Sequence, residues 1–63
     1  MNELSKLISD AKSFGFILRF EIVADQLGVR IVDGTHVIFN ISASTSFLKS
    51  AVRLAQEFLD ALD

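Results

Sequence analysis

The chain has 63 residues, a net charge of −2 at pH 7 and no cysteine, and 51% of its residues are hydrophobic. This length predicts a single domain, 1–63, which buries only about 60% of its extended surface and is therefore marginally stable. The lack of cysteine excludes disulfides and thiolate zinc sites, and a single histidine, His36, excludes a histidine-rich metal site. Dense apolar packing and oligomerisation remain as means of stabilisation.

The acidic balance, with a sequence pI of about 5.1, argues against electrostatically driven nucleic-acid binding, which normally needs a basic field. No apolar run approaches the ~20 residues of a membrane span. The first residues also lack the basic-then-apolar order of a secretory signal. We therefore expect a cytoplasmic protein with no membrane partner.

The first predicted element is a helix over about Glu3–Phe14, because apolar residues recur there at i, i+3, i+4 and i+7. Asn2 is expected to cap its N-terminus. Gly15 is expected to end it in the left-handed conformation. The apolar stripe consists of Leu4, Leu7, Ile8, Ala11 and Phe14.

The period of the pattern then changes from 3.6 to 2, which predicts a three-stranded antiparallel meander. The predicted strands are Phe16–Ala24, Val29–Val32 and Thr35 to about Ser42. Alternate residues of each strand are expected to face the core. The inward set is Leu18, Phe20, Ile22, Ala24, Val29, Ile31, Val37, Phe39 and Ile41.

The hydrophobic phase also predicts the hairpin loops, because a one-residue slip turns every side chain to the opposite face. The first loop is predicted as Asp25–Gly28. The second is predicted as three residues, Val32–Gly34, with Gly34 left-handed in a bulge. The resulting cross-strand pairs are Ala24–Val29, Ile22–Ile31, Val29–Val37 and Arg30–His36.

The last predicted element is a helix over Ser46–Asp63, capped by Ser44 or Thr45. Its apolar face covers about half of its circumference, wider than the roughly 100° stripe that a helix on one small sheet needs. The excess implies a second burial partner, either the first helix or another molecule. One of two flanks is expected to stay exposed, either Leu48, Val52 and Leu59 or else Leu54 and Ala61. The fold class is therefore predicted as α+β, α-β-β-β-α, a three-stranded antiparallel meander with two helices packed on one face.

The sequence holds no recognisable catalytic constellation. His36 is the only side chain expected to titrate near neutrality. Its nearest acid on the open sheet face, Glu21, is expected one strand further over, and general acid–base catalysis needs a second group within reach. The serines before the last helix are typical of capping, and the three glycines are too far apart for a phosphate loop. We expect no enzyme, no cofactor and no small-molecule substrate.

The outward face of the predicted sheet is less polar than a free antiparallel face, which normally alternates cleanly. Clustered exposed aliphatics mark interfaces, and both outer strands of a meander are edges open to pairing. A protein partner or a second copy is therefore expected at this face and at the last helix. The predicted partner-binding residues are Arg19, Glu21, Val23, Arg30, Val32, His36, Ile38, Asn40, Leu48, Val52 and Leu59.

The α-β-β-β-α order resembles double-stranded RNA-binding domains, and the last helix has a similar small-and-aliphatic spacing in Ser50–Ala55. The resemblance implies a lysine pair at the start of this helix to hold phosphates. Here Phe47 and Leu48 occupy those places, and the only cations of this helix are Lys49 and Arg53. The resemblance therefore covers the topology and not the binding residues.

The chain also resembles a family of small phage-encoded α-β-β-β-α proteins, an anti-CRISPR family that blocks an RNA-guided DNA nuclease. The shared features are short: the start Met1–Leu4 with Leu7 and Ile8, the hairpin Val32–Gly34, and a Val37–Ile38 strand followed by serines. That family acts as an acidic DNA mimic, whereas this chain is only mildly acidic. The resemblance implies a small protein-binding inhibitor and assigns no residues.

We therefore predict a non-catalytic protein-interaction module that homodimerises or binds a host protein as a phage or mobile-element inhibitor. The alternative is RNA or single-stranded DNA binding on the open sheet face, through Arg19, Arg30, His36 and Asn40. That alternative lacks an outward aromatic side chain on which a base could stack.

Overall fold

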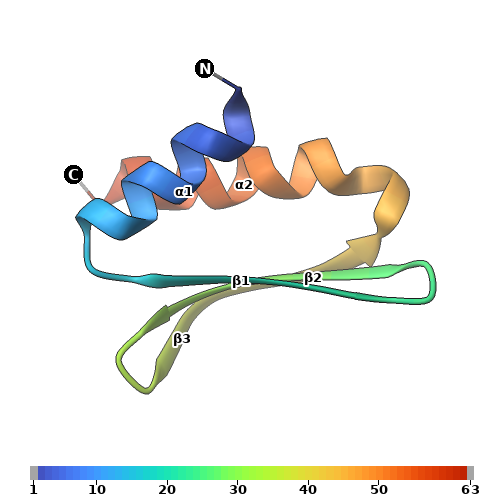
Figure 1. The fold of residues 1–63 in the computed structure, drawn as a ribbon, viewed down its shortest axis with the longest axis horizontal. Helices are drawn as coiled ribbons and strands as arrows, with labels where there is room; N and C mark the ends of the chain where they lie inside the picture. The colour runs from blue at the N-terminus through green and yellow to red at the C-terminus, as the bar shows by residue number, and fades with distance from the viewer. Residues whose placement is uncertain (1, 63) are drawn as a thin grey trace.

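The computed structural model describes residues 2–62 and confirms the predicted α-β-β-β-α order (Figure 1). A single 3-10 turn, η1, precedes the last helix. The predicted end of that helix at Asp63 lies outside the described residues. The elements are α1 (Glu3–Ser13), β1 (Ile17–Val23), β2 (Gln26–Asp33), β3 (His36–Ser44), η1 (Thr45–Phe47) and α2 (Leu48–Ala61).

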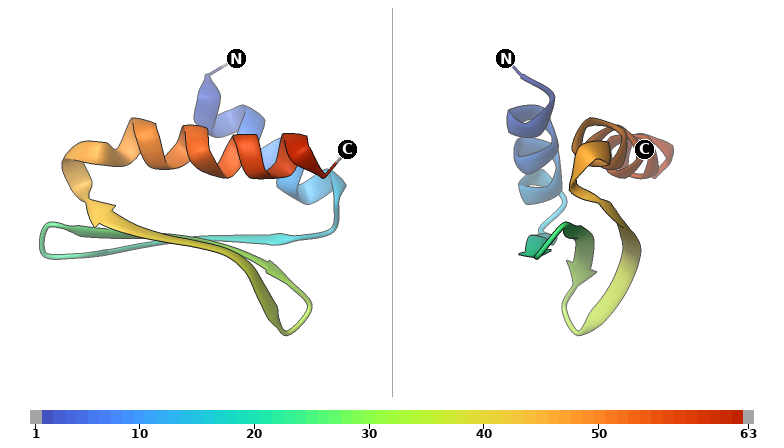
Figure 2. Two further views of the ribbon diagram at one scale, coloured as in Figure 1. Left: turned by 180° about the vertical axis from the view of Figure 1, so that it is seen from behind. Right: turned by 90° about the vertical axis from the view of Figure 1, so that its right-hand side faces the viewer.

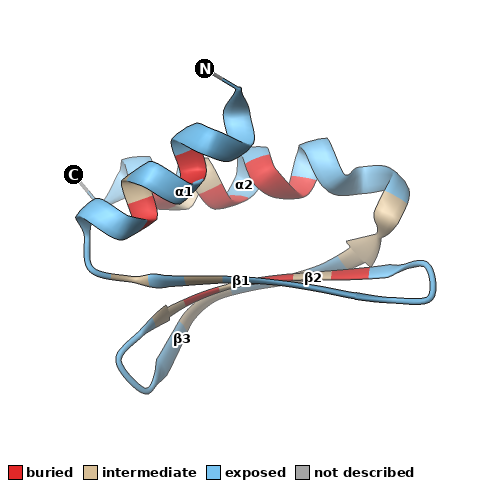
Figure 3. Ribbon diagram, in the orientation of Figure 1, coloured by how far each residue is buried: buried red, intermediate tan, exposed pale blue. Residues whose placement is uncertain are grey.

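The three strands form one antiparallel sheet in the order β1-β2-β3, and both helices lie on the same face of it (Figures 1 and 2). α1 packs against α2 and β1, while α2 packs against β2 and β3. The buried side chains lie between the helices and the central strand (Figure 3). They are Leu7, Ala11, Leu27, Val29, Ile31, Ala51, Val52, Ala55 and Leu59.

Both ends of α1 are capped as the sequence predicts. The Asn2 side chain accepts a hydrogen bond of 2.7 Å from the Ser5 backbone N–H, which satisfies one of the unpaired donors of the first turn. Gly15 lies in the left-handed region at φ +79°, where a glycine pays no Cβ penalty. The Phe16 backbone N–H then bonds to the Ala11 carbonyl at 3.0 Å and closes the helix end.

The predicted first hairpin loop is wrong. Val23 pairs with Gln26, so the turn is only two residues long, and Ala24 adopts a left-handed φ of +54°. β2 consequently starts three residues earlier than predicted, and Leu27 lies in the core with 1% exposure. The cross-strand pairs become Ile22–Leu27, Phe20–Val29 and Leu18–Ile31 in place of Ala24–Val29 and Ile22–Ile31.

The register error leaves the predicted faces of β1 and β2 unchanged. Each inward residue of β1 still pairs with an inward residue of β2, because the partner moves by an even number of positions. The pattern of alternation therefore identifies the faces, while the length of the turn decides which residues are opposite each other.

The second hairpin also differs from the prediction. Gly34 is left-handed as expected, at φ +63°, but Asp33 pairs with His36, so the turn has two residues instead of three. The predicted pairs Val29–Val37 and Arg30–His36 are wrong. Val29 pairs with Ile41, and Arg30 pairs with Asn40.

A β-bulge in β3 explains a second error. Val32 pairs with Val37 and Ile31 pairs with Phe39, which leaves Ile38 as the extra residue on β3. The extra residue reverses the alternation at that point. Val37, predicted to face the core, is 55% exposed, whereas Ile38, predicted to face outward, packs against the core.

The start of the last helix is a 3-10 turn and not the predicted α-helical turn at Ser46. The Ser44 hydroxyl accepts a hydrogen bond of 3.4 Å from the Ser46 backbone N–H and caps η1. In α2, Val52 and Leu59 of the first predicted flank are buried, at 4% and 1% exposure, whereas its third member, Leu48, is 42% exposed. Both residues of the other flank, Leu54 and Ala61, are exposed, and Leu54 is 44% exposed.

Substitution of Leu27 tests the two-residue turn. We expect Leu27→Ala to lower the free energy of unfolding by about 2–5 kcal/mol, the range for truncating a fully buried leucine. Val37→Ala, a truncation of an exposed side chain in β3, is expected to change it by no more than about 0.5 kcal/mol. Urea denaturation followed by circular dichroism measures both. Equal, small effects would place Leu27 in a surface loop and contradict the register.

Candidate functional site

Exposed apolar side chains gather on α1, on β1 and on the connection between them. Of the twelve large hydrophobic residues exposed in the described part of the chain, seven lie there. We call this set the α1–β1 surface. Its members are Leu4, Ile8, Phe14, Ile17, Phe20, Ile22 and Val23.

A hollow of about 280 Å³ lies between α1 and β1. Ile8 and Ala11 line it from the helix, and Phe16, Leu18 and Phe20 line it from the chain that follows. The Phe16 ring stacks on the Phe14 ring, with centroids 5.3 Å apart and planes 5° from parallel. The hollow is therefore largely apolar; Lys12 also lines it.

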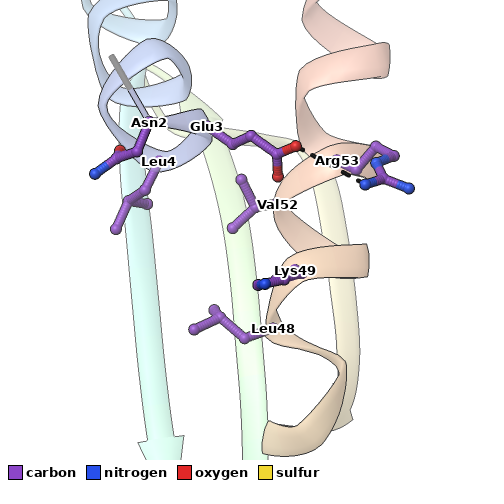
Figure 4. A pocket seen from close by; sticks show the side chains of 7 residues that line it. All are labelled: Asn2, Glu3, Leu4, Leu48, Lys49, Val52 and Arg53. Carbon is purple, nitrogen blue, oxygen red and sulfur yellow. Dashed lines mark ion pairs between the residues drawn. The ribbon is translucent and has the colours of Figure 1, made fainter.

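A second, larger hollow of about 470 Å³ lies between the first turns of the two helices (Figure 4). Leu4, Leu48 and Val52 form its apolar lining. The cations Lys49 and Arg53 also line it, and Arg53 lies 3.8 Å from a Glu3 carboxylate oxygen. Both hollows therefore border α1, and both expose apolar side chains.

The exposure of β1 follows from the path of α1. The helix lies closest to the sheet at its C-terminal end, above the start of β1, and rises away from the sheet toward its N-terminus (Figure 1). α2 packs on the other two strands. The far end of β1 is consequently uncovered on the helix side, and Ile22 is 65% exposed.

β1 is also an edge strand of the sheet. An edge strand presents a row of backbone N–H and C=O groups that can pair with another chain, and proteins usually block such edges with proline, lysine or a bulge. β1 contains no proline or lysine, and its pairing with β2 is regular over all seven residues. The α1–β1 surface thus combines exposed apolar side chains with an unprotected backbone edge.

The outward face of the sheet carries a row of polar residues across its middle. Arg19 lies opposite Arg30, and Arg30 lies opposite Asn40. Like charges placed directly opposite each other destabilise a strand pair. Glu21 relieves Arg30 through an ion pair of 3.2 Å. Within residues 2–62, Arg19 forms no ion pair.

The remaining residues predicted for the outward face do not join this row. Val32 lies between Ile17 and Val37 in a separate apolar row. His36 lies opposite Asp33 beside the second turn, and not beside Arg30 as predicted. Val23, Ile38, Leu48, Val52 and Leu59 lie at the first hairpin, at the bulge and on α2. The predicted partner-binding set is therefore spread over several surfaces and part of the core.

His36, the side chain expected to titrate near neutrality, lies beside the second turn. Its Nδ1 atom lies 3.5 Å from the Thr35 hydroxyl. Among residues 2–62, no three histidine or acidic side chains lie close enough together to hold a metal ion. Across the same residues, no helix combines the length and the apolar character needed to cross a bilayer.

A polar link joins the two helices beside the core. The Asp10 carboxylate accepts a hydrogen bond of 2.8 Å from Lys6 and one of 2.7 Å from Gln56 on α2. The hydrogen bond from Lys6, followed by that from Gln56, lowers the pKa of Asp10 below its usual 3.8. Asp10 and Gln56 therefore help to hold α1 in the position that leaves β1 partly uncovered.

The sequence interpretation missed the inward-facing members of the α1–β1 surface. It placed Leu4, Ile8, Phe20 and Ile22 in the core because their spacing matches a helix stripe and a strand face. Phe20 and Ile22 do point toward the helix layer, but α1 is too short and too steeply inclined to cover them (Figure 1). Leu4 and Ile8 lie on α1 itself and are exposed there. The unprotected edge of β1 was the signal in the sequence that could have located this surface.

No protein family, curated protein or solved structure matches this chain.

The Asp10 contacts predict a pH-dependent stability. Because the folded-state pKa of Asp10 is lowered below its usual 3.8, its stabilising effect is full above that usual value and is lost as the pH falls through the folded-state pKa. We expect Asp10→Ala to have a lower Tm than the natural chain at pH 7. The difference should shrink steadily below about pH 4. Thermal unfolding measured by circular dichroism tests this, and a pH-independent difference would contradict it.

Proposed function

We propose that the chain is a non-catalytic protein-interaction module that binds its partner through the α1–β1 surface. The supporting observation is the coincidence of exposed apolar side chains with the free edge of β1. A marginally stable small domain gains little from apolar side chains left in water. Burial of Ile22 and Phe20 against a partner would recover that free energy.

The backbone edge supplies a specific mode for this interaction. A strand added to an open edge contributes main-chain hydrogen bonds, and the side chains on both faces of the sheet then set its specificity. On the inner face, β1 offers Leu18, Phe20 and Ile22, with the hollow beside Ile8 next to them. The edge and the hollow together can receive an extended segment with apolar side chains.

The partner in this proposal is a protein, either a second copy or a host protein in the cytoplasm. The resemblance to phage-encoded inhibitors supports a host protein. The alternative, nucleic-acid binding on the outward face, has the adjacent Arg19 and Arg30 in its favour. Against it, Glu21 neutralises Arg30 at 3.2 Å, and His36 lies at the far hairpin. We therefore favour a protein partner.

Site-specific photo-crosslinking tests the proposed surface. A benzophenone amino acid replaces Ile22 on β1 or, as a control of similar chemistry, Leu54 on α2. Leu54 is four residues before Phe58, which contacts Phe39 of β3, so it lies on the side of α2 away from α1. Irradiation in producing cells should give an adduct with one defined protein at position 22 and none at position 54.

A second substitution separates specific binding from chance contact. Phe20→Glu places a charge in the apolar surface without replacing a member of the buried set. Because Phe20 lies opposite the buried Val29, circular dichroism of this variant verifies its folding. It should remove most of the adduct formed at position 22. Equal adducts at positions 22 and 54, or an adduct that survives Phe20→Glu unchanged, would overturn the proposal.

A further inference from the structure

We infer that the partner of the α1–β1 surface is a second copy of this chain, whose β1 pairs antiparallel with β1 about a two-fold axis at Phe20. This inference rests on the proposed function and identifies its partner. The pairing would join two three-stranded sheets into one continuous sheet, with all four helices on the same face.

The side chains of β1 are self-complementary about its midpoint. β1 runs from Ile17 to Val23, so Phe20 is its central residue. An antiparallel pair centred there places Arg19 opposite Glu21 of the second copy, an opposite-charge pair that stabilises adjacent strands. The full set of opposed residues is Ile17–Val23, Leu18–Ile22, Arg19–Glu21 and Phe20–Phe20, each between the two copies.

Other registers lose this match. A shift that centres the axis on Arg19 or on Glu21 would place two like charges opposite each other, which is destabilising. A shift by one residue in the pairing would set Phe20 opposite an outward-facing residue. The helix-covered face of one sheet would then continue into the outward face of the other. The chemistry of the strand therefore selects one register.

The same pairing resolves the unfavourable charges of the outward face. In one copy, Arg19 lies opposite Arg30 and has no ion pair among the described residues. In the dimer, Arg19 gains Glu21 of the second copy on its other side. Each Glu21 then lies between two arginines, its own Arg30 and the Arg19 across the axis. Opposite charges therefore face each other where the two copies meet.

The two-fold axis also places a helix beside the uncovered half of β1. α1 lies above the start of β1 and not above its far end (Figure 1), and Leu18 shares a hollow with Ile8 and Ala11 of α1. Because Leu18 of the second copy lies opposite Ile22, the second α1 comes to the side of Ile22. Ile22, which is 65% exposed in one copy, is then covered from the second. The missing cover of each sheet is supplied by the other copy.

Mixing two charge-reversal variants tests the register directly. Arg19→Glu alone sets Glu opposite Glu in the homodimer, and Glu21→Arg alone sets Arg opposite Arg. A mixture of the two restores both opposite-charge pairs in a heterodimer. We expect the dissociation constant, measured by sedimentation velocity over a concentration series, to rise about tenfold in each variant. The equimolar mixture should return to the dissociation constant of the natural chain.

Controls separate this interface from a general charge effect. Arg53→Glu and Glu57→Arg make the same changes on the exposed face of α2 and should leave the dissociation constant unchanged. Circular dichroism of each variant verifies folding. A further measurement uses a chain that keeps Arg19 and Glu21. In this chain, the benzophenone at position 22 should crosslink to the start of β1 of a second copy.

The outcomes distinguish this inference from the proposed function. A natural chain that stays monomeric at all concentrations, yet gives an adduct with a host protein at position 22, overturns the dimer and leaves the interaction surface in place. A dimer that survives both single variants and gains nothing from mixing shows a different interface and overturns the pairing about Phe20. No adduct of any kind at position 22 overturns both.

Discussion

The rest of this structure depends on one constraint: two short helices can bury only part of one face of a three-stranded sheet. α1 has 11 residues and so spans only about 16 Å, whereas the seven residues of β1 extend over roughly 23 Å. The short connection through Gly15 also ties the C-terminal end of α1 to the start of β1. The helix is therefore shorter than the strand, and because it also rises away from the sheet, it leaves the far end of β1 in contact with water (Figure 1).

The distribution of buried residues follows from this constraint. The fully buried side chains come from the central strand, from both helices and from no residue of β1. Leu27, Val29 and Ile31 lie beneath the helix layer, while Phe20 and Ile22 on the neighbouring strand face the same layer and stay exposed. The Asp10–Gln56 hydrogen bond fixes α1 to α2 and so maintains the gap over β1. Stability and the exposed surface thus arise from the same arrangement.

The sequence predicted the elements of the fold because periodicity and capping are local. The 3.6 and 2 periods identify both helices and all three strands, and Asn2 and Gly15 mark the ends of α1 correctly. The turns were not predictable in the same way. The sequence predicts Gly28 as a loop residue, but it is the third residue of β2. The first turn depends on Ala24 at φ +54°, which alanine seldom adopts. The pairing of β1 with β2 therefore determines the position of the first turn, although the residues of the turn do not favour it.

The bulge in β3 and the exposure of β1 were not predictable from the sequence for a different reason, because both depend on contacts with other elements. Val37 and Ile38 are both apolar, so the sequence does not show which one faces the core, and the pairing of Ile31 with Phe39 decides it. The sequence likewise marks Phe20 and Ile22 as apolar and inward-facing, and this is correct. It does not show how far α1 reaches over them. Burial on an edge strand depends on the layer above it, and a single strand pattern carries no information about that layer.

The central claim is that the open edge of β1 is completed by a second copy. Amide hydrogen exchange of β1, followed residue by residue in NMR spectra over a concentration series, measures this most directly. The amides of β1 that face the free edge should exchange rapidly in dilute protein and slow down as the concentration rises, while those of β2 stay protected throughout. Edge amides that exchange rapidly at every concentration would contradict the account.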